Sequence, residues 1–223
     1  MTSKLVGKKI LIIVENLPVP PDRRVWQEAK ALKEAGCKVS IICPTGRGYN
    51  KKYEVIDDIH IFRHSLPLEA DDAKGYMVEY SIALFWEFIL SWRVFFRRGF
   101  DAIHACNPPD TIFIIGLLFR LLGKKFIFDH HDLNPELYEV KFGRQDFFYK
   151  TLLFLERLTF RTASVTIATK ESYKAIAVKR GGKDPDNVFV VRSAPDMSKL
   201  SVSGSNENLK NGRKYVIGYV GVM

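Results

Sequence analysis

Short runs of branched apolar residues alternate along this chain with longer stretches whose apolar positions recur at helical spacing. The runs have the length and continuous apolar character of strands that are buried on both faces. The predicted strands cover residues 9–14, 39–43, 102–106, 125–129, 165–168 and 187–191. The predicted helices cover residues 22–35, 76–98, 109–122, 145–161 and 171–180. This order predicts an α/β fold, a doubly wound parallel sheet with helices on both faces.

Two segments depart from this alternation. Residues 53–65 are predicted to form a hairpin or a bent strand that turns at Asp57-Asp58. Residues 198–213 are polar, contain two glycines and are typical of a linker between residues 1–197, the predicted domain, and the end of the chain. Residues 214–223 (KYVIGYVGVM) have the pattern of a strand, which needs partners for its backbone groups. We therefore expect them to be the first strand of a second domain that this chain lacks.

Composition narrows the class of protein. The formal net charge of +9 predicts attraction to anions, but does not choose between phosphates, anionic lipids and nucleic acid. The basic residues are spread along the chain and no nucleic-acid recognition motif is present, so nucleic acid is disfavoured. Three widely spaced cysteines indicate a reducing compartment rather than a disulfide framework or zinc site. No apolar run reaches the roughly 20 residues of a spanning helix, so we expect a cytoplasmic or peripheral membrane protein.

Candidate chemistry gathers in the loops that follow the predicted strands. In doubly wound sheets, ligands bind outside the carboxyl ends of the strands. The candidate substrate-binding residues in these loops are Asn16, Asp22, Arg23, Arg24, Asn107, Asp110, Asp129, His130, Glu136 and Lys170. The strand-end rule and the residue types therefore indicate the same edge of the sheet.

The loop after the first strand (ENLPVPPDRRVWQEA) has no glycine and three prolines. It therefore lacks the GxGxxG fingerprint of a dinucleotide-binding domain, and it lacks a Walker lysine motif. Asp22 is the expected N-cap of the first helix, and it places Arg23 and Arg24 in the first turn. A helix N-terminus with two arginines favours phosphate or carboxylate. The alternative is a solvated arginine pair capped by Asp22.

The segment FDHHDLNPELYE (residues 128–139) carries two histidines between two aspartates. Successive strand side chains point to opposite faces, so Asp129 and His131 share one side while His130 and Asp132 share the other. We expect one histidine to face the ligand and the other to support the loop. No further His, Cys or carboxylate stands at a recognisable ligand spacing, so no metal is predicted.

Two other features allow two interpretations each. Pro108 and Pro109 end one strand and start the next helix with Asp110 in its first turn, which is either a plain junction or a substrate contact. The aromatic helices at residues 80–98 and 146–161 end in arginines. They either pack on the sheet and on each other, or place aromatic surface in an anionic bilayer interface.

Four segments resemble the N-terminal half of bacterial glycosyltransferases of the group 1, or family 4, type. They are LIIVENLPVPPDRRVWQEAKALKEAGCKVSIICP, KFIFDHHDLNPELYE, LERLTFRTASVTIATKES and YVIGYVGVM. The resemblance implies a GT-B architecture of two Rossmann-like domains, the first binding mostly acceptor and the second mostly nucleotide-sugar. It also implies sugar transfer with retention of configuration, without a catalytic metal and without another cofactor.

On residues, the resemblance matches the cleft histidine of the family to His131, with Asp132 beside it, as the catalytic candidates. The loop at residues 16–24 corresponds to the family's glycine-rich loop near the donor diphosphate. Its prolines depart from that pattern, and Arg23 and Arg24 are the expected substitutes. The donor-phosphate Arg/Lys pair and the acidic E-x7-E element of the family lie in the second domain, so we expect this chain alone to be inactive.

The expected function is therefore that of the acceptor-binding half of a hexosyltransferase. Charge, aromatic helices and resemblance together predict a saccharide or polyprenyl-diphosphate-linked acceptor, cell-surface polysaccharide synthesis, and a place on the inner face of a membrane with anionic lipids. The alternative is a non-catalytic GT-B-like scaffold that partners a separate transferase chain.

Overall fold

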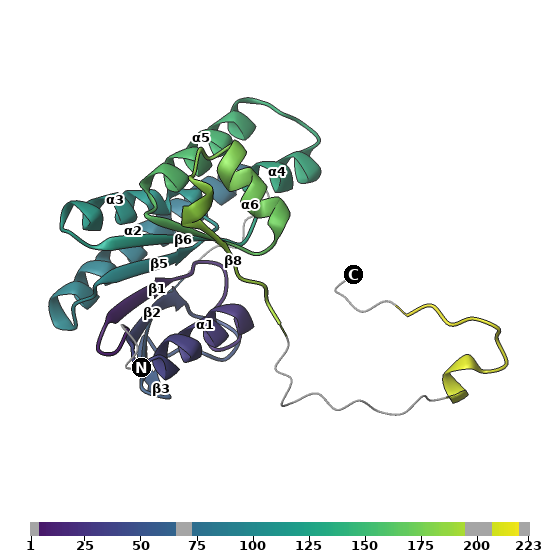
Figure 1. Cartoon of the computed structure of the whole chain (residues 1–223), viewed down its shortest axis with the longest axis horizontal. Helices are drawn as coiled ribbons and strands as arrows, with labels where there is room; N and C mark the ends of the chain where they lie inside the picture. Colours follow the sequence, from purple (N-terminus) through teal and green to yellow (C-terminus); the bar gives the residue numbers. More distant parts are fainter. Residues whose placement is uncertain (1–4, 66–72, 195–206, 219–223) are drawn as a thin grey trace. The chain divides into compact units, whose positions relative to one another are not determined.

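The computed structural model describes residues 5–65, 73–194 and 207–218 (Figure 1). The chain divides into two compact units, Met1–Arg192 and Ser193–Met223. The described part of the second unit contains a short 3-10 helix, η4 (Glu207–Lys210). Residues 214–218 are not in a strand, and the rest of the predicted linker and strand, residues 198–206 and 219–223, lies outside the described residues. The second-domain strand stays a prediction.

Within the described residues, the first unit is built on one eight-stranded sheet with the order β3-β4-β2-β1-β5-β6-β7-β8. The strands are β1 (Lys9–Ile13), β2 (Lys38–Pro44), β3 (Tyr53–Ile56), β4 (Ile59–His64), β5 (Ala102–Cys106), β6 (Lys125–His130), β7 (Val165–Ala168) and β8 (Val188–Val190). All neighbours pair in parallel except β3 and β4, which form the predicted hairpin. Asp57 and Asp58 both have positive φ at its two-residue turn, as a primed hairpin turn requires.

The helices are α1 (Arg23–Glu34), α2 (Ala73–Arg97), α3 (Phe113–Leu121), α4 (Asn134–Phe142), α5 (Phe147–Thr162) and α6 (Glu171–Lys179), with 3-10 turns η1 (Asp110–Ile112) and η2 (Pro185–Asn187). The predicted helix at residues 109–122 is thus split into η1 and α3. The sequence patterns did not predict α4. No helix of the described residues is both long and apolar enough to cross a membrane.

Strand alternation divides the core into two layers, as a doubly wound sheet requires. Leu11 and Ile13 of β1 pack toward α2, α3, α5 and α6, whereas Ile10 and Ile12 pack toward α1. Figure 1 shows α1 on one side of the sheet and α3 and α5 on the other. The predicted fold class is confirmed.

The topology also marks the place where ligands bind in open α/β sheets of this kind. From β1 the chain moves outward through β2 and β4, and it returns to the other side of β1 as β5 before it continues to β6, β7 and β8. The strand order therefore reverses between β1 and β5. Such a switch point opens a crevice at the carboxyl ends of the two strands.

Candidate functional site

A charged cluster connects α1 to the carboxyl end of β6 beside the switch point. The guanidinium of Arg24 donates from one terminal nitrogen to Asp129 Oδ1 at 3.0 Å and from the other to the carbonyl of Val191 at 3.0 Å. Arg24 Nε donates to His131 Nε2 at 2.8 Å. All three guanidinium nitrogens thus contact protein groups. The structure brings three of the predicted residues, Arg24, Asp129 and His131, into direct contact.

Two residues outside the predicted set complete this cluster. Glu28 lies one helical turn after Arg24, and its Oε1 is 3.1 Å from Arg24 Nε. His104, from the middle of β5, places Nε2 3.1 Å from Asp129 Oδ2 and 3.5 Å from Glu28 Oε2. The i, i+4 spacing of Arg24 and Glu28 was visible in the sequence as a helical pair. The position of His104 next to both carboxylates depends on strand pairing and had no local signal.

The electrostatics of the cluster follow from burial and from these partners. Burial raises the pKa of Asp129, but hydrogen bonds from His104 and His131 outweigh burial and hold that pKa well below its usual range. Burial raises the pKa of Glu28 to about 7 although His104 and Arg24 act against it. Burial lowers the pKa of His104, yet its hydrogen bond to Asp129 leaves it raised. The fully buried Asp129 is therefore the fixed negative charge of the site.

His131 makes two contacts through one ring nitrogen. Nε2 accepts the hydrogen bond of Arg24, and it also lies 2.9 Å from Asp129 Oδ2. One nitrogen cannot accept from Arg24 and donate to Asp129 at the same time. The hydrogen bond from Arg24 requires a neutral ring with its proton on Nδ1. A hydrogen bond to Asp129 requires a ring with a proton on Nε2. The arrangement can thus hold a proton on either nitrogen while the ring stays in place.

Asn107 fixes the backbone of the loop that carries His131. Its Oδ1 accepts from the backbone N–H of His131 at 2.7 Å and of Asp132 at 3.1 Å. Its Nδ2 donates to the carbonyl of Asp132 at 2.7 Å and to Asp110 Oδ1 at 3.1 Å. Asn107 is almost completely buried. The end of β5 therefore sets the path of the chain after β6.

Asp110 extends this network toward α4. Its Oδ2 accepts from Asn134 Nδ2 at 2.7 Å. Burial raises the pKa of Asp110 to about 6 despite its hydrogen bonds from Asn134 and Asn107. Asp132 is half-buried, and burial raises its pKa, although the nearby histidines act against it. Both carboxyls can therefore take up protons more readily than exposed ones.

His130 does not join the cluster with His131, because adjacent strand residues point to opposite faces. It is fully buried on the other side of the sheet, with Nε2 3.5 Å from Glu156 Oε1 and its ring against Phe160 and Tyr173. Glu136 pairs with Arg180, which also donates to Glu156 at 2.6 Å. His130 thus lies on the opposite side of the sheet from His131, as strand alternation predicts, and this second network of His130, Glu136, Glu156 and Arg180 holds α4, α5 and α6 together.

The remaining predicted residues lie apart from this cluster. Asp22 is the N-cap of α1, and its side chain accepts from the backbone N–H of Val25 at 3.1 Å. Asn16 and Arg23 are exposed. Lys170 precedes α6, with its ammonium 4.8 Å from the centre of the Tyr173 ring. The N-cap expectation for Asp22 is confirmed.

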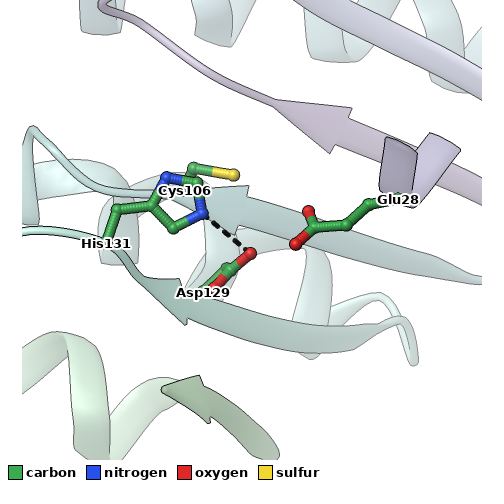
Figure 2. A group of neighbouring side chains, drawn as sticks. All are labelled: Glu28, Cys106, Asp129 and His131. Atoms are coloured by element: carbon green, nitrogen blue, oxygen red, sulfur yellow. Dashed lines mark ion pairs between the residues drawn. The ribbon is translucent and has the colours of Figure 1, made fainter. Parts of the chain in front are cut away.

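Three side chains of the cluster and the neighbouring Cys106 form a group that could be considered as metal ligands. One ligand atom from each of Glu28, Cys106, Asp129 and His131 lies within 4.8 Å of the others (Figure 2). Two observations disfavour a metal there. The Arg24 guanidinium already contacts Glu28 and Asp129, and burial raises the pKa of the Cys106 thiol well above its usual value, so the thiolate that a metal needs is disfavoured. The donor set suits a guanidinium better than a metal.

Fold and site together define a class of protein. A Rossmann-like sheet with polar loops at its switch point is consistent with the N-terminal half of a GT-B glycosyltransferase fold. The chain belongs to Glycosyltransferase Family 4, since the model of that family matches residues 22–199. The resemblance seen in the sequence is confirmed.

Known proteins agree with this assignment. Chitobiosyldiphosphodolichol beta-mannosyltransferase of Candida glabrata is 24% identical over 214 residues, which are 91% of this chain and 46% of that protein. Sucrose-phosphate synthase from Thermosynechococcus elongatus superposes with a TM-score of 0.64 at 15% identity, over 86% of this chain and 49% of the other. Phytolacca americana UGT2, complexed with UDP-2fluoro-glucose and pterostilbene, superposes with a TM-score of 0.56 at 14% identity. The match covers 92% of this chain and 56% of the other. The chain spans about half the length of each.

Proposed function

We propose that this chain is the acceptor-binding half of a retaining, metal-independent hexosyltransferase. The whole protein would move a sugar from a nucleotide-sugar to a saccharide or lipid-linked saccharide in cell-surface polysaccharide synthesis. Membership of Glycosyltransferase Family 4 supports sugar transfer. The name of the Candida glabrata relative describes an acceptor saccharide on a diphosphodolichol, which supports a lipid-linked diphosphate acceptor here.

The observation that carries the proposal is the contact of His131 with Asp129 and Arg24 at the switch point. Asp129 and Arg24 restrain one ring nitrogen of His131, and we assign the other, Nδ1, to the substrate. Because the guanidinium of Arg24 is engaged with Asp129, we assign Arg24 to positioning rather than to the diphosphate. A departing nucleotide diphosphate needs positive charge. We expect most of that charge to come from the second domain, with the exposed Arg23 as the contribution of α1.

Association with the inner face of a membrane is part of this proposal. Large apolar side chains are exposed on several helices of one layer, among them Phe85 of α2, Leu121 of α3 and Phe147 of α5. A contiguous apolar patch on a protein surface marks a protein or membrane interaction site, and we expect these helices to contribute to one. The net charge of +9 favours anionic lipid. Flotation with vesicles containing phosphatidylglycerol tests this part, and equal flotation with neutral vesicles would contradict it.

The test of the function compares His131→Ala with the parent in the full-length protein. We expect turnover to fall about 100-fold or more, since a positioned histidine typically contributes 10²–10⁴-fold. We expect donor affinity to change far less, because the second domain reads most of the donor. Product analysis by NMR gives the anomeric configuration, and a parallel assay in EDTA tests the independence from metal.

His60→Ala is the matched control, since His60 lies on β4 and contacts Tyr53 in the hairpin. This variant should keep parental turnover. Unchanged turnover of His131→Ala would remove His131 from the mechanism. Repeated turnover by residues 1–223 alone would contradict the assignment of this chain as an inactive half.

A further inference from the structure

An apolar groove with a volume of about 310 Å³ lies between α2, α4 and α5, outside the charged cluster. Its walls are mostly apolar side chains, including Leu84 of α2, Leu137 of α4, and Phe148 and Leu152 of α5. This volume is at the lower end of the range for small-molecule sites, which starts near 300 Å³. The groove therefore suits a narrow ligand or one part of a longer ligand.

The topology places this groove at the same edge of the sheet as the charged cluster. A helix that leads into a parallel strand runs antiparallel to it, so its first half lies at the carboxyl edge. α2 leads into β5 and α5 leads into β7, and the groove is lined by residues from the first halves of both helices. The groove and His131 thus share one edge.

Residues from the loops beside the charged cluster also line the groove, and two of them, Thr111 and Asn134, are polar. Pro108 follows Asn107, and Asn134 comes three residues after His131; both line the groove. Thr111 also lines it, and the Thr111 hydroxyl oxygen is buried without a hydrogen-bond partner among the described residues. A buried hydroxyl without a partner indicates that a ligand or water completes it. The groove is therefore amphipathic, with this polar part beside the catalytic loops.

The lining selects the chemistry of the ligand. A free sugar would lose hydrogen bonds on entering among leucine and phenylalanine side chains, so a saccharide is disfavoured in the apolar part. A hydrocarbon chain loses none. Lys141 lines the groove, and the side chains of Val140 and Phe147 nearby in α4 and α5 are 85% and 77% exposed. A basic residue among exposed apolar residues complements an anionic lipid.

We propose that this groove holds the first part of the hydrocarbon chain of a lipid-linked diphosphate acceptor. The diphosphate and its sugar then lie at the polar part of the groove, beside the loop of His131. This inference rests on the proposed function and adds to it the residues that distinguish a lipid-linked acceptor from a soluble saccharide.

The experiment measures binding of two probes to the chain by calorimetry: farnesyl diphosphate and inorganic diphosphate. We expect farnesyl diphosphate to bind at least tenfold more tightly, because several methylene groups leave water. Thr151→Trp fills the groove from α5 and should abolish this difference. Ser172→Trp makes the same kind of change on an exposed position of α6 and should preserve it.

Leu137→Gln is a second variant, chosen because Leu137 is 53% exposed and its replacement disturbs folding little. We expect it to weaken farnesyl diphosphate binding several-fold without affecting inorganic diphosphate. Equal affinity of the parent for both probes would overturn the proposal that this groove binds a hydrocarbon chain. An undiminished preference for farnesyl diphosphate in Thr151→Trp and Leu137→Gln would overturn it as well. If the groove proposal fails in this way, sugar transfer to a soluble saccharide would still support the proposed function. If the full-length protein binds farnesyl diphosphate in this groove but has no transferase activity, the proposed groove is supported and the proposed function is contradicted.

Discussion

Two buried carboxyl groups at the carboxyl edge of the sheet, Asp129 and Glu15, behave in opposite ways. Both side chains are almost completely inaccessible. The hydrogen bonds of His104 and His131 hold the pKa of Asp129 well below its usual range despite burial. Burial, together with the nearby charge of Glu79, raises the pKa of Glu15 to about 8. Equal burial therefore gives opposite charge states at neutral pH.

The difference lies in what each carboxyl faces. Asp129 faces a guanidinium and two imidazoles, whereas Glu15 faces Glu87 on α2, whose pKa burial raises well above its usual value. Among the described residues, both oxygens of Glu87 and one of Glu15 have no hydrogen-bond partner. The sheet edge thus holds a fixed negative charge on the α1 side and two buried carboxyls with raised pKa values toward α2. Neighbouring charges, more than depth, decide which carboxyls can serve a charged role.

Removing the charge of Asp129 should have the largest effect on stability at a fixed pH. Asp129→Asn leaves the Arg24 guanidinium without its buried partner, and the loss of such a partner typically costs about 3–5 kcal/mol. Because Arg24 keeps its contact with Glu28, we expect a loss of about 3 kcal/mol. The free energy of unfolding in urea at pH 7 measures it. Asp58→Asn is the matched control, because its ion pair with Lys33 is exposed. That change should cost under about 1 kcal/mol, and equal losses in both variants would contradict the comparison.

Because the pKa of Glu15 is raised in the folded protein, its contribution to the free energy of unfolding should fall as pH rises. The folded pKa of about 8 lies above the ordinary value of 4.5, so the folded state binds the proton more tightly. Its contribution is complete at acidic pH and is lost as pH rises from about 4.5 to about 8. Glu15→Gln should remove on the order of 4 kcal/mol of this dependence between pH 5 and pH 8.5. Urea unfolding at both pH values measures the difference.

Glu87→Gln should change the pH dependence in the same direction, since burial and the nearby Glu15 raise the pKa of the Glu87 carboxyl well above its usual value in the folded protein. The slope with pH is the decisive quantity, because a buried amide changes stability by a constant amount at every pH. Parallel pH profiles of the parent and both variants would show that these acids are not protonated.

Glu28 sharpens the comparison, because it is less buried than Glu15, with 15% of its side chain exposed, and it lies beside Arg24 and His104. Its pKa of about 7 means that its contribution to stability falls between about pH 4.5 and 7. Glu28→Gln should flatten the profile in that window by about 2–3 kcal/mol, less than Glu15→Gln does. Glu34→Gln, on an exposed position of α1, is the control. A larger effect at Glu28 than at Glu15 would reverse the order argued here.

Local sequence patterns predicted the parts of the fold that depend on near neighbours. Asp22 caps α1 as expected, and the turn at Asp57-Asp58 forms the predicted hairpin. The separation of His131 from His130 followed from strand alternation alone. Each of these features involves residues within a few positions of one another, so the sequence contains their cause.

Long-range features could not be predicted in the same way. The contact of Arg24 with His131 joins residues 107 positions apart, and the place of His104 depends on the register of β5 against β6. The helix α4 was missed for a different reason. Leu137 and Val140 are exposed while Tyr138 is buried, so α4 has no apolar stripe at helical spacing, and no side chain caps its start.

Asn107 holds the loop after β6 only through backbone groups of residues 131 and 132. Such hydrogen bonds do not depend on which side chains those two positions carry. The loop can therefore exchange its side chains during evolution and keep the same course. The end of β5 therefore sets the course of this loop, while the residues at positions 131 and 132 set its chemistry.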